Sequence, residues 1–276
     1  MYGYGEATGE MKGRTILVSL SAAFAVLLVV SIVFASGFVN VSRVSLFSGP
    51  PGGLLDSTAN VFVDPDKIIK DYVADPGYQI GNTFVVHVNI TGVADLFSYQ
   101  VNVTWNTAIL NFTGIYEYGE FLDRTGSIHG TSRIEEICPA SNETGYALIA
   151  ETILGEYPGI TGDGRLVTLE FEIVGYGCTY INISIGGAFP TMLLESTVGA
   201  SIPFTTAGGY FRNKVIGDAD ADGTVNVFDI LKVKYHWFPG PPAGAGGYER
   251  NVDCDDDGSI NVFDILIVKA NWGRSI

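Results

Sequence analysis

The sequence holds few of the residues on which catalytic and nucleic-acid-binding sites commonly depend. It has three cysteines, three histidines, and 15 lysines plus arginines against 30 aspartates plus glutamates, which gives a net charge of −15. An acidic excess of this size argues against binding to the phosphates of nucleic acid. The histidines are scattered and no serine lies in a nucleophile elbow, so we expect no enzymatic activity. Three cysteines allow at most one intramolecular disulfide.

The acidic residues are concentrated in a repeat near the C-terminus. The segment Asp218 to Trp237 recurs as Asp253 to Trp272, with 13 of 20 positions identical. Each copy has aspartates at positions 1, 3 and 5, a glycine at 6, an asparagine at 9 and an aspartate at 12. Oxygen ligands at this spacing wrap around a hard cation, usually Ca²⁺, so we predict two bound Ca²⁺ ions. The predicted ligands are Asp218, Asp220, Asp222, Thr224 (through its backbone carbonyl), Asn226 and Asp229, and in the second copy Asp253, Asp255, Asp257, Ser259, Asn261 and Asp264.

The segments before and after each loop differ in kind. Glycines and prolines ahead of both loops exclude a continuous entering helix. After each loop, apolar residues fall at helical spacing, beginning at Val227 in one copy and Val262 in the other. The sequence therefore predicts a small α domain over residues 213–276, built from two loop–helix repeats.

The repeat resembles a dockerin domain, the paired calcium module that docks onto cohesin domains. Dockerins of this type carry aspartate at the twelfth loop position and lack the entering helix, as this chain does. The resemblance implies that partner choice rests on loop positions 10 and 11 and on the following helix. Both copies have Val-Phe there, which implies an apolar partner groove and, with two-fold symmetry, two binding orientations. Packing of the phenylalanines in the core is the competing interpretation. The expected partner-binding residues are Val227, Phe228, Lys232, Lys234, Val262, Phe263 and Lys269.

An uncharged apolar run near the N-terminus predicts export. Residues 15–39 are long enough to cross a bilayer as a transmembrane helix. Basic residues before the run place segment 1–14 in the cytoplasm and the rest outside. A signal peptide cleaved near Ala35 and a pilin-type leader cut near Gly13 are the alternatives. Residues 40–58 are predicted to be a linker.

Residues 59–212 are predicted to form an antiparallel β-sandwich, which makes the chain mainly β. Alternating apolar and polar runs recur between turn residues, which indicates strands with one buried face. In one run, Val86, Val88 and Ile90 share a face, opposite more polar positions. The predicted strands cover 60–63, 83–91, 97–105, 109–116, 146–153, 166–174 and 179–185.

The order of sequence motifs in this domain resembles that of a cohesin domain. One cohesin motif begins with an aromatic residue, and the corresponding residues here are Trp105-Asn106-Thr107, which keep the aromatic residue and change the rest. A cohesin-like, jelly-roll sandwich is the implied fold, although carbohydrate-binding sandwiches share the same rhythm. The Gly177-Cys178 step is similar to one in archaeal cohesin-like proteins, which implies an archaeal cell-surface protein.

Two further features fit an exported chain. Cys138 and Cys178 lie in one predicted domain and are a disulfide candidate, whereas Cys254 has no evident mate. Six Asn-x-Ser/Thr sequons are glycosylation candidates. These are Asn40, Asn89, Asn102, Asn111, Asn142 and Asn182.

Together these features predict a membrane-anchored extracellular adaptor. It would dock cohesin or dockerin domains of other proteins, or further copies of itself, through a calcium-stabilised tail. One alternative is a polysaccharide-binding sandwich tethered by the tail, with Tyr99, Tyr116, Tyr118 and Tyr157 stacking on sugar rings. The other alternative gives the calcium loops a purely structural role.

Overall fold

The computed structural model describes residues 58–122, 133–153, 158–196, 199–238 and 246–276. Every described residue belongs to one compact unit, which covers residues 55–276. The predicted cytoplasmic segment, membrane span and nearly all of the linker lie outside the described residues. Within the described ranges, no helix is long and apolar enough to cross a membrane.

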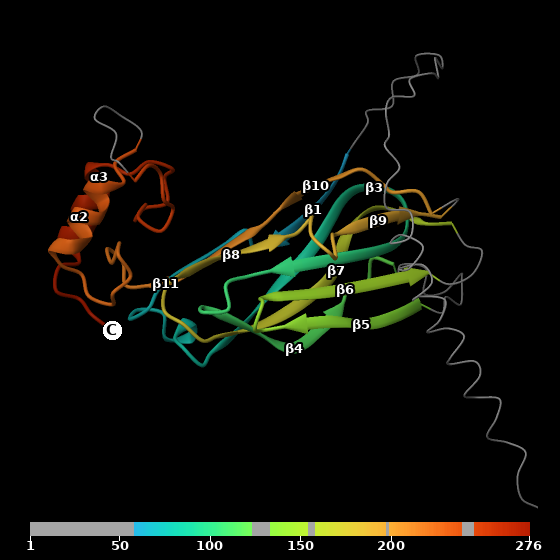
Figure 1. Ribbon diagram of the computed structural model, residues 1–276, viewed down its shortest axis with the longest axis horizontal. Coiled ribbons are helices and arrows are strands. Elements are labelled where there is room, and N and C mark those ends of the chain that lie inside the picture. Colours follow the sequence, from blue (N-terminus) through green and yellow to red (C-terminus); the bar gives the residue numbers. More distant parts are fainter. Residues whose placement is uncertain (1–57, 123–132, 154–157, 197–198, 239–245) are drawn as a thin grey trace, which may run out of the picture. The chain divides into compact units, whose positions relative to one another are not determined.

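The described residues are mainly β, as predicted, and end in two short α-helices (Figure 1). The strands are β1 (Ala59–Asp64), β2 (Lys67–Asp71), β3 (Thr83–Thr104), β4 (Leu110–Tyr118), β5 (Arg133–Ser141), β6 (Tyr146–Ile153), β7 (Ile160–Ile173), β8 (Cys178–Ile183), β9 (Met192–Glu195), β10 (Phe204–Ala207) and β11 (Gly209–Lys214). The helices are α2 (Val227–Tyr235) and α3 (Val262–Ala270), with a 3₁₀ turn, η1, at Pro76–Tyr78.

The long strand β3 joins the layers of the sandwich. Its first half pairs antiparallel with β1 and β7, and its second half pairs with β6, β8 and β9. Val86, Val88 and Ile90 lie on its buried face, as the alternation predicted. They belong to one continuous apolar core that also includes Leu169 and Phe171 of β7.

The structure corrects several details of the predicted strands. The predicted strands 83–91 and 97–105 form one continuous strand. The turn-like residues near Gly92 produce shifts in the pairing register with β7 but do not end the strand. Leu166 is fully buried, although the alternation along β7 would place it on the same face as Thr168 and Glu170. Strands β2, β5, β9 and β10 were not predicted. Of these, β2 and β10 pair in parallel with distant partners, which a local pattern does not reveal.

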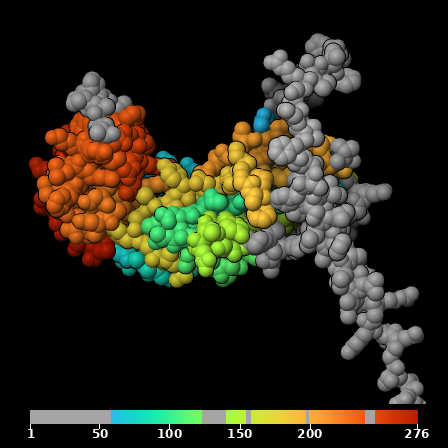
Figure 2. All heavy atoms as spheres, viewed as in Figure 1, coloured from blue at the N-terminus to red at the C-terminus, as the bar shows by residue number. Residues whose placement is uncertain are grey.

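The last strand of the sandwich leads directly into the tail. β11 pairs antiparallel with β8 and parallel with β2, and the predicted boundary between residues 212 and 213 falls inside it. Beyond β11, α2 and α3 lie side by side (Figure 1) and the tail forms one compact group of atoms, coloured orange to red in Figure 2. A second, smaller apolar core fills the tail. Its buried members are Val215, Ala219, Val225, Val233, Val252, Cys254, Ile260 and Val268.

Replacing Phe171 with alanine should destabilise the sandwich strongly. The side chain is fully buried and stacks edge-on against Trp105, with ring centroids 5.0 Å apart. Removing so large a core side chain costs about 3–5 kcal/mol of unfolding free energy. The matched control is Ile115→Ala, at an exposed position, where we expect a change below about 0.5 kcal/mol. Urea unfolding in calcium measures both, and equal losses would contradict the assigned core.

Candidate calcium loops and docking face

Each loop gathers its first three aspartates around one point. Within each group, one carboxylate oxygen from every residue lies within 4.8 Å of the others. Gly223 and Gly258, at position 6, have φ of 91° and 88°, a backbone conformation that an L side chain rarely adopts. The chain can therefore turn back and bring these carboxylates together. The groups are Asp218, Asp220 and Asp222, and Asp253, Asp255 and Asp257.

The first aspartate of each loop is buried and held by donors. In Asp218, Oδ2 accepts hydrogen bonds from the backbone N–H of Gly223, at 3.0 Å, and from the hydroxyl of Tyr176. Its Oδ1 is buried and has no hydrogen-bond partner. A buried anionic oxygen without a partner is costly, and a cation bound between the carboxylates would satisfy it. The donor set of the loops therefore fits the Ca²⁺ that the sequence predicts.

The residues at loop positions 9 and 12, predicted as calcium ligands, also form the N-terminal cap of the helix that follows each loop. Asn226 is the N-cap of α2, and its side-chain oxygen accepts from the N–H of Phe228 at 2.8 Å. Asp229 accepts from the N–H groups of Ala219 and Asp220 with Oδ1, and from that of Asn226 with Oδ2. This reciprocal arrangement is a capping box. The N-x-x-D spacing before an apolar run was the signal that the sequence prediction missed.

The second loop repeats this arrangement. Asn261 caps α3, and Asp264 accepts from the N–H groups of Cys254 and Asn261, at 2.7 Å each. At position 7, the N–H groups of Thr224 and Ser259 each donate to the aspartate at position 5 of the same loop, at 2.8 Å. The aspartate at position 12 thus ties the loop to its helix, so the loop geometry and the helix start depend on each other.

The carboxylates gathered in each loop shift the pKa values of several of these aspartates. Burial, with Asp229 nearby, raises the pKa of Asp220 to about 6. Partial desolvation of the otherwise exposed carboxylate and a hydrogen bond with Asp253 raise the pKa of Asp255 to about 6. The pKa of Asp264 is also raised, chiefly by burial. Each shift disfavours the ionised form, which is the form that a bound divalent cation would favour.

The expected docking residues are on the surface and match between the two repeats. Val227 and Phe228 are 48% and 60% exposed, and Val262 and Phe263 are 48% and 59% exposed. The small core of the tail is filled instead by Val233 and Val268. The competing interpretation, in which the two phenylalanines form that core, is therefore wrong.

Of the three lysines expected at the rim of this surface, two are exposed and one is paired. Lys234 and Lys269 are exposed, whereas Lys232 lies 3.3 Å from the carboxylate of Glu249. Leu231 and Leu266, one helical turn beyond the Val-Phe pairs, are also exposed, and they extend the apolar surface along each helix. We call Val227, Phe228, Leu231, Val262, Phe263 and Leu266 the docking face.

Residues 216–271 match the family model of the dockerin type I domain. The predicted resemblance of the tail to a dockerin is confirmed. Among curated proteins, none matches the chain.

The solved structures similar to this chain include cohesins. The non-cellulosomal cohesin from the archaeon Archaeoglobus fulgidus has 15% identity and a TM-score of 0.38, over 56% of this chain and 91% of that chain. A type II cohesin from the cellulosome of Acetivibrio cellulolyticus has 13% identity and a TM-score of 0.39, over 55% and 94%. The third cohesin ScaC of that organism, in complex with the ScaB dockerin, has 12% identity and a TM-score of 0.42, over 57% and 100%. These identities and TM-scores are too low to assign a function to the sandwich of this chain.

Basic side chains of β11 contact both calcium loops, a feature that sequence reasoning missed. Arg212 donates to the carbonyls of Asp253 and Cys254, at 3.0 and 3.3 Å. Lys214 donates to the carbonyls of Asp218 and Asn251, at 2.5 and 3.0 Å. Both cations are buried, so β11 fastens the sandwich to the dockerin-like domain through backbone oxygens of the loops.

The disulfide and one glycosylation prediction need correction. Cys178 is a free thiol, so the predicted bond to Cys138, whose side chain lies outside the described residues, is not formed. Asn102 is buried, and its Nδ2, the atom that would carry a glycan, donates to the carbonyl of Phe189 at 2.7 Å. Asn40 lies outside the described residues. The remaining candidates, Asn89, Asn111, Asn142 and Asn182, are exposed or half-buried.

The three described tyrosines among those expected to stack on sugars do not form a shared surface. Tyr99 and Tyr118 are buried, and the hydroxyl oxygen of Tyr99 lies 2.8 Å from both the carboxylate of Glu151 and the carbonyl oxygen of Leu166. Tyr116 packs edge-on against Tyr118, with ring centroids 5.6 Å apart, and Tyr157 lies outside the described residues. These residues do not support the polysaccharide alternative.

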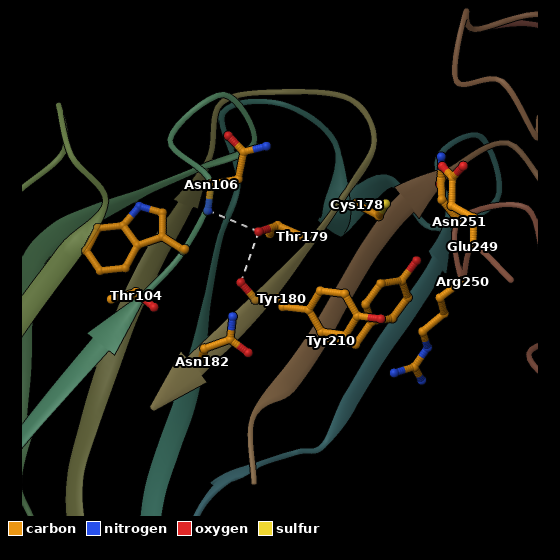
Figure 3. Close-up of a pocket in the computed structure, with 11 residues that line it drawn as sticks. Thr104, Asn106, Cys178, Thr179, Tyr180, Asn182, Tyr210, Glu249, Arg250 and Asn251 are labelled. Carbon is orange, nitrogen blue, oxygen red and sulfur yellow. Dashed lines mark hydrogen bonds between the residues drawn. The ribbon is translucent and has the colours of Figure 1, made fainter. Parts of the chain in front are cut away.

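A pocket of about 470 Å³ lies where β8 and β11 approach the segment before the second loop (Figure 3). Tyr180 and Tyr210 line it, together with Asn182 and Arg250. Arg250 is already engaged, because it stacks 4.1 Å from the ring of Tyr210 and pairs with Asp256 at 2.8 Å. Thr179 fixes the pocket wall by accepting from the N–H of Asn106.

The raised pKa values of Asp220 and Asp255 predict how stability depends on pH without calcium. A carboxyl group with a higher pKa in the folded chain binds protons more tightly there, so the unfolding free energy falls as pH rises from about 4 to about 6. In Asp71, Asp95 and Asp256, hydrogen bonds outweigh burial and lower the pKa. These three groups make the unfolding free energy rise with pH, but only below about pH 4, outside the window in which Asp220 and Asp255 act. In EGTA, we expect the Tm to fall between about pH 4.5 and 6.5.

Excess calcium provides the control for this titration. Calcium should remove the fall in Tm, because bound cations offset the repulsion between the ionised carboxylates. A Tm that rises with pH in EGTA over the same window, or that follows the same course in both conditions, would contradict the charge distribution assigned to the loops.

Proposed function

We propose that this chain is an extracellular, membrane-anchored adaptor that docks partner proteins non-covalently through its calcium-stabilised dockerin-like domain. The dockerin type I match supports a protein–protein docking module. The apolar run 15–39 and the linker 40–58 support an anchor that holds the module outside the cell. The expected partners are cohesin domains of other proteins or the sandwich of a second copy.

The observation that carries this proposal is the matched exposure of the Val-Phe pairs. Large apolar side chains that stay exposed together indicate an interaction surface. The two pairs have nearly the same exposure, although each lies at the start of a different helix. An apolar centre with Lys234 and Lys269 nearby has the usual anatomy of a docking interface. The equivalence of the repeats supports two binding orientations.

The loops would connect calcium to this surface. Ca²⁺ bound in each loop would supply positive charge to the clustered carboxylates. Asp229 and Asp264 each hold backbone N–H groups of their own loop and of the following helix start. Fixing the loop therefore fixes the first turn of the helix, where the Val-Phe pair is located. We propose one ion in each loop.

The contacts within the chain favour docking between molecules. The sandwich is fastened to the dockerin-like domain by Arg212 and Lys214, and by Arg274, which forms a bidentate pair with Asp71 at 2.8 and 3.0 Å. None of these residues belongs to the docking face. The Val-Phe pairs thus stay exposed while the two parts are joined, and they are available to another molecule.

The same contacts favour a second candidate function, in which the calcium loops only stabilise the end of the sandwich. Buried Arg212 and Lys214 bond to loop carbonyls, so an ordered loop would also order β11. This candidate requires no partner and leaves the exposure of Phe228 and Phe263 without a role. Variants that change the docking face and spare the loops therefore distinguish the two candidates.

We expect Phe228→Asp combined with Phe263→Asp to abolish docking and to leave calcium binding intact. Truncating a hot-spot aromatic residue of an interface costs about 2 kcal/mol or more, and each orientation loses one such residue, so the double variant should bind at least about 30-fold more weakly. Either single variant should bind only about two-fold more weakly, because one of two equivalent orientations survives. Surface plasmon resonance against immobilised cohesin domains and this chain's own sandwich, with calcium and with EGTA, measures these affinities.

Ile115→Asp is the matched control, since Ile115 is exposed on the sandwich and outside the docking face. Its affinity should equal that of the unaltered chain. Docking that is insensitive to both phenylalanines would overturn the assigned face. An unaltered chain that binds calcium yet captures none of these domains would favour the structural role.

A further inference from the structure

The two calcium loops share one feature that lies outside their aligned sequences. In each loop, Oδ2 of the first aspartate accepts from the N–H of the glycine at position 6 and from a tyrosine hydroxyl. In the second loop the donor is Tyr248, which precedes Asp253 in the dockerin-like domain. In the first loop the donor to Asp218 is Tyr176, which belongs to the sandwich.

The orientation of Tyr176 is fixed by its neighbours. It lies in the turn between β7 and β8, and its ring packs edge-on against Tyr72, with centroids 5.2 Å apart. Its hydroxyl oxygen accepts from the N–H of Val215 at 2.9 Å. The hydroxyl hydrogen is therefore directed to Asp218.

This contact determines which oxygen of Asp218 is left for a metal ion. Tyr176 and Gly223 both donate to Oδ2, and Oδ1 is the buried atom that has no hydrogen-bond partner. Lys214 holds the same residue from the backbone side through its carbonyl oxygen. Partners that orient a metal ligand in this way affect the affinity for the metal without touching it.

We propose that Tyr176 is a positioning residue of the first calcium loop, so that the sandwich completes a metal site of the dockerin-like domain. This inference rests on the proposed binding of calcium by the loops. The two loops then differ in a way that their repeated sequence conceals. The second loop obtains its tyrosine from its own domain, whereas the first depends on the β7–β8 turn of the sandwich.

The test measures one loop at a time in the full chain by calorimetric titration with Ca²⁺. Asp255→Asn with Asp257→Asn disables the second loop at residues that are exposed, and Asp220→Asn with Asp222→Asn disables the first. With only the first loop active, Tyr176→Phe should weaken calcium binding by about 10-fold or more, and Tyr248→Phe should leave it unchanged. With only the second loop active, Tyr248→Phe should weaken calcium binding and Tyr176→Phe should leave it unchanged.

Phenylalanine keeps the ring that packs against Tyr72, and the Tm of each variant in excess calcium confirms that it folds. Luminescence of Tb³⁺ in place of Ca²⁺ gives an independent reading. Excitation of tyrosine should sensitise Tb³⁺ in the first loop, and Tyr176→Phe should reduce that emission with little change in the second loop.

The outcomes separate this inference from the function on which it rests. If the unaltered chain binds no calcium, the calcium assignment fails and the positioning role fails with it. If calcium binds but Tyr176→Phe leaves the affinity of the first loop unchanged, only the positioning role is overturned. Equal weakening of both loops would show a general loss of structure and would also overturn it.

Discussion

Repulsion among the clustered carboxylates of the two loops is the constraint on which the rest of the tail depends. Three aspartates converge in each loop, and partial desolvation leaves Asp220 and Asp255 with raised pKa values. Their backbone surroundings supply N–H donors, yet Oδ1 of buried Asp218 is left without one. Folding of this segment therefore brings together charge that requires a counter-ion. The helix starts at Asn226 and Asn261 share the aspartates of these loops, so the docking face depends on the same balance.

The sandwich contributes more than a platform for this module. Arg212 and Lys214 of β11 donate to backbone carbonyls of both loops, and Tyr176 in the turn before β8 donates to Asp218, the first aspartate of the first loop. The apolar face of the helices takes no part in these contacts. The dockerin-like domain can therefore be attached to the sandwich while its docking face stays exposed. Buried polar hydrogen bonds hold the attachment, whereas the docking face consists of apolar side chains elsewhere on the domain.

The sequence predicts the features that local spacing controls. Aspartates at alternate positions and a glycine at position 6 define each loop, and alternation places Val86 and Val88 in the core. The remaining features depend on distant contacts. Tyr176 contacts Asp218, which lies 42 residues further along the chain. β2, near the start of the sandwich sequence, pairs in parallel with β11, near its end. The exposure of Phe228 also needed the structure, because helical spacing alone does not show which apolar side chains pack between two helices.

Hydrogen–deuterium exchange of the full chain, with saturating calcium and with EGTA, tests the central claim most directly. The account predicts that calcium protects the amides of α2 and α3 and of both loops, while the amides of β3 and β7 in the sandwich core exchange at the same rate in both conditions. Equal protection of α2 and α3 with and without calcium would contradict it, because the helices that present the docking face would then not depend on neutralisation of the loops.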